Sequence, residues 1–107
     1  MFGNLFKTAE VDEYADWIVA EVKRSLPPGY SPGTRNIEER AEKLNASVGA
    51  RTVEFVRTVK LNIYKKARLA ARVRDGMAAH GYPDAFVQSF SFELITRIQA
   101  AAKARTD

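Results

Sequence analysis

Residues 51–80 read RTVEFVRTVKLNIYKKARLAARVRDGMAAH. This stretch has no proline, and its apolar residues recur at intervals of three and four. Such spacing places them on one face of an α-helix and continues a stripe that begins at Ile37. The stripe consists of Ile37, Ala41, Leu44, Val48, Phe55, Val56, Val59, Ile63, Ala67, Ala70, Val73 and Met77.

Gly49 is the interruption in this stripe. A glycine inside a helix costs about 1 kcal/mol relative to alanine, which a packed helix tolerates. Because the apolar residues keep their helical phase on both sides of Gly49, we favour one long central helix over residues 37–80, straight or kinked. The alternative is two helices, broken between Asn45 and Ala50. A single helix over this segment would be about 66 Å long at ~1.5 Å per residue.

Two further helices flank the central segment, each with its own apolar stripe. The first is predicted from Thr8 to about Leu26, and the last from Asp84 to about Arg105. PPGYSPG, residues 27–33, is predicted to form the turn between the first helix and the central segment. Proline cannot continue a helix, and glycine permits sharp bends. HGYPD, residues 80–84, ends the central segment, and Gly81 suits the left-handed position after a helix. The flanking stripes are Val11, Ala15, Ile18, Val22 and Leu26, and Val87, Phe90, Leu94, Ile98 and Ala101.

These patterns predict an all-α protein. No segment has the alternation typical of a strand, so we expect a helical hairpin or bundle of three to four helices. The length of 107 residues fits one domain over residues 1–107, with residues 1–7 as a short apolar tail. The chain has no cysteine, which excludes disulfides and thiolate metal sites and fits a cytoplasmic location. We find no signal segment and no run of ~20 apolar residues that would span a membrane.

The positive charge of the chain is concentrated on the central segment. Residues 51–82 hold eight basic and two acidic side chains, a net charge of +6, whereas the whole chain has a net charge of +4. On one helix, basic residues opposite the apolar stripe would form a band about 22 Å long. Such a band attracts polyanions and can contact several phosphates without reading bases. The candidate polyanion-binding residues are Arg57, Lys60, Lys65, Arg68, Arg72 and Arg74.

The basic band also has other interpretations. Lysine and arginine are good helix formers and are common on solvated faces. Acidic residues of the first helix could lie beside the band and neutralise it, within the fold or between subunits. An anionic membrane surface is less favoured, because the core needs the opposite, apolar face. The acidic residues in question are Glu10, Asp12, Glu13, Asp16 and Glu21.

Trp17, Leu61 and Phe92 are large apolar residues that lie off the stripes of their own helices. Three such residues in a small chain suggest a second buried surface. One explanation is a homo-oligomer or a helical protein partner that packs against them. Alternatives are coverage by the apolar tail MFGNLF, or a helix that the chain itself encloses on two sides. We treat these three as candidate interface residues, with Trp17 as the main anchor.

The sequence shows no catalytic, cofactor-binding or metal-binding constellation. His80 is the single histidine, and beside Gly81 it fits a helix C-terminal residue better than a catalytic base. Glu10 and Glu13 form a pair of the kind that helical metal-dependent hydrolases use, but residues 51–74 offer only Glu54 as a facing acid. We therefore expect no enzyme, no cofactor and no small-molecule substrate.

Two functional hypotheses follow from these patterns. The favoured one is a small non-enzymatic helical interaction or assembly protein that self-associates through its apolar helix faces. The alternative is a nucleic-acid binder that contacts phosphates through the basic face of residues 51–74. A hydrolase built on paired acids is a third hypothesis, which the sequence favours least.

Overall fold

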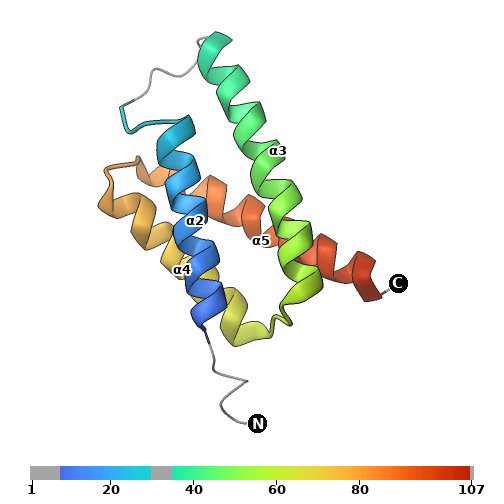
Figure 1. Ribbon diagram of the computed structural model, residues 1–107. Coiled ribbons are helices and arrows are strands. Elements are labelled where there is room, and N and C mark those ends of the chain that lie inside the picture. Colours follow the sequence, from blue (N-terminus) through green and yellow to red (C-terminus); the bar gives the residue numbers. More distant parts are fainter. Residues whose placement is uncertain (1–7, 30–34, 107) are drawn as a thin grey trace.

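Four α-helices make up the described part of the chain (Figure 1). The computed structural model describes residues 8–29 and 35–106, and no strand occurs among them. The all-α prediction is therefore confirmed. The tail 1–7 and the end of the predicted turn 27–33 lie outside the described residues. The helices are α2 (Ala9–Ser25), α3 (Arg35–Thr58), α4 (Ile63–Ala79) and α5 (Asp84–Thr106).

The outer helices and the turn after α4 agree with the sequence patterns. Both α2 and α5 end within one residue of their predicted limits. His80 is the C-cap residue of α4, and Gly81 follows it in the left-handed conformation, with φ +89°. The N–H of Gly81 donates to the carbonyl of Ala78 at 3.0 Å, and the N–H of Tyr82 donates to that of Met77 at 3.3 Å. This Schellman pattern satisfies carbonyls at the helix end and turns the chain towards α5.

The central segment consists of two helices rather than one. The predicted continuous helix over residues 37–80 is wrong, because α3 ends at Thr58 and α4 begins at Ile63. The alternative break between Asn45 and Ala50 is wrong as well, since α3 runs through Gly49 without interruption. A helix of about 66 Å is thus absent from the described residues. The described residues span 48 × 30 × 19 Å.

Residues 59–62 form a corner between α3 and α4, and Asn62 explains where α4 starts. Its backbone is extended, with φ −99° and ψ 179°, and its side-chain oxygen accepts a hydrogen bond from the N–H of Lys65 at 2.8 Å. This N-cap satisfies one of the free first-turn donors and is worth about 1 kcal/mol relative to alanine. Val59 is buried and Leu61 is partly buried against the core, so apolar contacts hold the corner in place.

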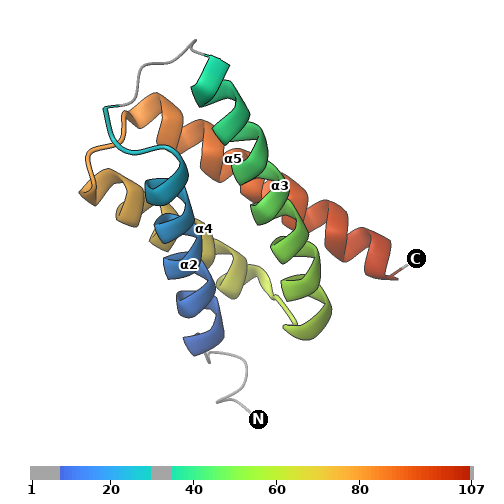
Figure 2. The same cartoon turned by 45° about the horizontal axis from the view of Figure 1, so that its top comes forward.

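The corner turns α4 back so that it lies against α2. This helix pair has the most extensive contact in the fold. The α5 helix contacts α3 and α4, and it crosses behind α3 in Figures 1 and 2. Hydrogen bonds join Asp12 to Arg68 and Asp16 to Arg72, and just beyond the two helices the Tyr82 hydroxyl donates to the carbonyl of Leu26. Each pair is 56 positions apart, which shows that α2 and α4 run parallel.

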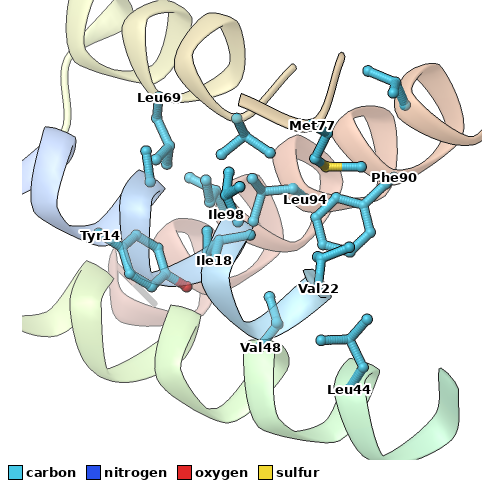
Figure 3. Packing of buried hydrophobic residues seen from close by; sticks show 14 of the residues in the cluster. Tyr14, Ile18, Val22, Leu44, Val48, Leu69, Met77, Phe90, Leu94 and Ile98 are labelled. Carbon is cyan, nitrogen blue, oxygen red and sulfur yellow. The ribbon is translucent and has the colours of Figure 1, made fainter. Parts of the chain in front are cut away.

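The hydrophobic core lies where the four helices meet (Figure 3). The stripes predicted for α2 and α5 supply much of it, and the largest fully buried side chains include Ile18, Met77 and Ile98. Ile63, which the sequence assigned to the central stripe, is 85% exposed. It follows the corner directly, and the corner breaks the helical phase that related it to α3.

The α2 and α4 helices approach each other closely at Gly76. A Cβ atom built on Gly76 would lie 2.9 Å from Cγ2 of Val19 and 3.4 Å from Cγ1. Val19 is buried and β-branched, and its χ1 rotamer in a helix is strongly restricted. The side chain of Val19 therefore cannot move aside, and the missing side chain at position 76 allows the two helices to touch.

Gly76→Ala is expected to lower the free energy of unfolding by about 1 kcal/mol. Overpacking costs ~1–3 kcal/mol, and the higher helix propensity of alanine returns at most ~1 kcal/mol. In a Val19→Ala background the same substitution should instead stabilise the protein, because the clash is gone and the propensity gain remains. Urea unfolding of the four proteins measures both effects. An equal effect of Gly76→Ala in both backgrounds would contradict the close approach.

Candidate interaction surfaces

Two of the six candidate polyanion-binding residues are engaged within the fold. Arg68 donates from Nε to Oδ1 of Asp12 at 2.9 Å and from Nη2 to Oδ2 at 3.0 Å. Arg72 makes the same two-point contact with Asp16, at 3.2 and 3.4 Å. One alternative interpretation of the basic band was that acidic residues of the first helix neutralise it. This interpretation is correct for Arg68 and Arg72.

Asp12 sits between both arginines, because Nε of Arg72 is also 3.8 Å from its Oδ1. The hydrogen bond from Arg68 lowers the pKa of Asp12 below its ordinary value of 3.8, and desolvation opposes this effect only in part. The same hydrogen bond raises the pKa of the Arg68 guanidinium. These charged contacts fasten α2 to α4 along the edge of their interface.

The other four candidates, Arg57, Lys60, Lys65 and Arg74, do not lie on one helix. Arg57 is in the last turn of α3, Lys60 is in the corner, and Lys65 and Arg74 belong to α4. The single band predicted from the sequence is therefore divided. None of the four forms an ion pair with a carboxylate of the described residues. We name Arg57, Lys60, Lys65 and Lys66 the basic corner.

Trp17 lies in a groove between α2 and α3 that we name the aromatic groove. Its ring stacks on Tyr14 with a centroid distance of 6.0 Å, and Tyr14 stacks on Phe55 at 4.3 Å. The guanidinium carbon of Arg51 lies 5.1 Å from the centroid of the Trp17 ring. The groove measures about 210 Å³ and is lined by Glu10, Glu13, Tyr14, Trp17, Arg51, Phe55, Thr58 and Val59.

A buried hydrogen-bond chain fixes the base of the aromatic groove. The Tyr14 hydroxyl is hydrogen-bonded to Oγ1 of Thr52, and Thr52 donates to the carbonyl of Val48 at 2.7 Å. Because the single hydroxyl proton of Thr52 is used in this way, Tyr14 is the donor in the first bond. Burial raises the pKa of Tyr14. These hydrogen bonds link α2 to α3 and fix the position of the Tyr14 ring.

The three candidate interface residues have different surroundings. Trp17 and Leu61 are partly buried and pack against the core of their own chain. Phe92, on α5, is 74% exposed. The described residues therefore cover two of the three candidates to a large extent and leave Phe92 open.

The residues one helical turn before and after Phe92 on α5 are uncharged. On a helix, the neighbours of a residue are three and four positions away, and for Phe92 these are Gln88, Ser89, Ile95 and Thr96. Phe92 is the only large apolar residue on the exposed side of α5 among the described residues. The buried side of this helix carries Val87, Phe90, Leu94 and Ile98.

Three further large apolar residues, Val53, Ile63 and Tyr64, are exposed and were not among the predicted interface residues. Ile63 was expected in the core, and Val53 and Tyr64 are 44% and 46% exposed. For Ile63 and Tyr64, the sequence signal was Asn62, the residue just before them. Asparagine is a strong N-cap residue, so Asn62 indicated that a new helix begins there. For Val53, no signal in the sequence separates it from its buried neighbours.

The described residues contain no group of three or more His, Cys, Asp and Glu side chains that could hold a metal ion. None of the helices in this part of the chain has the length and apolar content needed to cross a bilayer. Comparison with known proteins finds no matching family model, no matching curated protein and no matching solved structure. Function is therefore inferred from the side chains themselves.

The pairing of Asp12 predicts a specific acid sensitivity. Its pKa is lower in the folded state than in the unfolded chain, so its stabilising contribution is fully present above pH 3.8 and is lost as the pH falls through the folded value. Asp12→Asn should therefore flatten the dependence of the unfolding free energy on pH below about pH 4. Chemical denaturation at pH 6 and at pH 3 measures this, with Glu10→Gln as a matched control. The same pH dependence in wild type and Asp12→Asn would contradict the pairing.

Proposed function

We propose that this protein is a non-enzymatic helical interaction protein that self-associates through the exposed surface of α5 around Phe92. The observation that carries the proposal is the 74% exposure of Phe92, a large aromatic residue on the solvent side of α5. Uncharged neighbours support it, because the centres of protein interfaces are depleted in charge and enriched in aromatic residues. In a two-fold dimer, the surface around Phe92 of each copy would bury that of the other, because such an interface pairs the same patch on both molecules.

Phe92→Ser tests this proposal. A central aromatic residue of an interface is worth 2 kcal/mol or more, so the substitution should weaken self-association at least ~10-fold. Sedimentation equilibrium or light scattering over a concentration series measures the effect. Val53→Ser, which removes an exposed apolar residue from α3 instead, is the matched control and should leave association unchanged. A wild-type protein that is monomeric at high micromolar concentration would overturn the proposal.

Polyanion binding by the basic corner is a second candidate function. The observation that favours it is that Arg57, Lys60, Lys65 and Lys66 lie in the corner and the helix turns next to it, and that none of them pairs with a described carboxylate. No acidic residue occurs between positions 57 and 74. The corner also adjoins the N-terminus of α4, where the helix dipole is positive. These charges would contact phosphates without distinguishing bases.

Binding of labelled duplex and single-stranded nucleic acid at ~50 mM salt tests the second candidate. Affinity should fall steeply with added salt, since phosphate contacts release counterions. A combined Lys60→Gln, Lys65→Gln and Lys66→Gln variant should weaken binding and reduce the salt dependence. Arg72→Gln, compared with the single variant Lys60→Gln, is the matched control and should have the smaller effect, because Arg72 is held by Asp16. Failure of both nucleic acids to bind wild type would exclude this function.

A further inference from the structure

The aromatic groove between α2 and α3 combines three features that suit a positively charged side chain. Trp17 presents its indole ring, and cations are attracted to the faces of aromatic rings, most strongly to tryptophan. Glu10 and Glu13 line the same groove and are exposed. Neither glutamate forms an ion pair with a described basic residue. At about 210 Å³, the groove has room for several water molecules at ~30 Å³ each, or for the end of a long side chain.

The chain already places a cation of its own in this position. The guanidinium of Arg51 lies over the Trp17 ring at 5.1 Å, although Arg51 is exposed to solvent. This contact is direct geometric support for the attraction of a cation to the ring. An exposed cation–π contact is weak, about 0.5–1 kcal/mol, so a competing cation can replace Arg51.

We propose that the aromatic groove binds a lysine or arginine side chain of a basic segment in a partner protein, and that this side chain displaces Arg51 from Trp17. Glu10 and Glu13 supply the complementary negative charge. The rings of Trp17 and Phe55 contact the aliphatic stem, as aromatic surfaces commonly do for long basic side chains. The buried bond between Tyr14 and Thr52 keeps this arrangement formed before the partner arrives.

The groove lies apart from the surface of α5 around Phe92, so this inference does not rest on self-association. The two can be tested independently in the Phe92→Ser variant, in which the surface of α5 is altered and the groove is intact. Trp17 is the sole tryptophan of the chain. Its fluorescence therefore reports on the groove without interference from another residue of its kind.

Titration with blocked tetralysine and tetra-arginine peptides tests the proposal, with tetraglutamine as the neutral control. The basic peptides should change Trp17 emission saturably, and tetraglutamine should not. Combined Glu10→Gln and Glu13→Gln should weaken binding about threefold or more, since exposed charge pairs each contribute modestly. Arg51→Gln should tighten binding about two- to fivefold by freeing the ring face. Arg57→Gln, which removes the same charge away from the ring, should tighten it less.

Four results of these titrations would overturn the proposal, and a dilution experiment supplies a fifth. They are the absence of saturable change with either basic peptide, an equal response to tetraglutamine, unchanged affinity in the glutamate variant, and equal tightening by Arg51→Gln and Arg57→Gln. A change in Trp17 emission on dilution of Phe92→Ser protein alone would show that a second copy occupies the groove, which contradicts assignment to a separate partner. Thermal melts of each variant establish that the helices remain folded.

Discussion

The hydrogen bond from the N–H of Lys65 to the side chain of Asn62 marks the point on which the arrangement of the helices depends. This hydrogen bond caps the first turn of α4, which runs in a different direction from α3 after α3 ends at Thr58. With the corner in place, α4 packs along α2 and a single chain closes its own core. Without it, the apolar face of α4 would extend beyond the reach of α2 and α5, and a second chain would have to cover it. The corner thus decides whether the core is completed within one molecule.

Much of the fold could be predicted because apolar periodicity reflects burial directly. The stripes of α2 and α5 and the Gly81 turn were found from residue spacing alone. The corner was missed because the apolar stripe appeared to keep its phase through residues 59–63, and phase does not reveal a change of direction. Val59 and Ile63 fit one continuous face, yet one is buried and the other is 85% exposed. Asn62 was the local signal for a new helix, and it was outweighed by the longer pattern.

The candidate surfaces were less predictable, because they depend on which helices become neighbours. The basic character of residues 57–74 was evident, but only the parallel packing of α2 on α4 shows that Arg68 and Arg72 meet Asp12 and Asp16. Trp17 was recognised as lying off its stripe, whereas its contact with Arg51 and the stacking of Tyr14 on Phe55 depend on the packing of α2 against α3. Close packing at Gly76 is likewise a property of the helix pair and not of either sequence segment. The sequence shows which residues are charged or apolar, but it does not show which residues of other helices they contact.

The most direct test of this account is the set of backbone Cα secondary chemical shifts across residues 50–75, measured by NMR. The account predicts helical values through Thr58, non-helical values at Lys60, Leu61 and Asn62, and helical values again from Ile63. Uninterrupted helical values over the whole range would contradict it. That result would restore the long central helix, separate the α2 and α4 faces that are in contact here, and remove the basis for the surfaces described above.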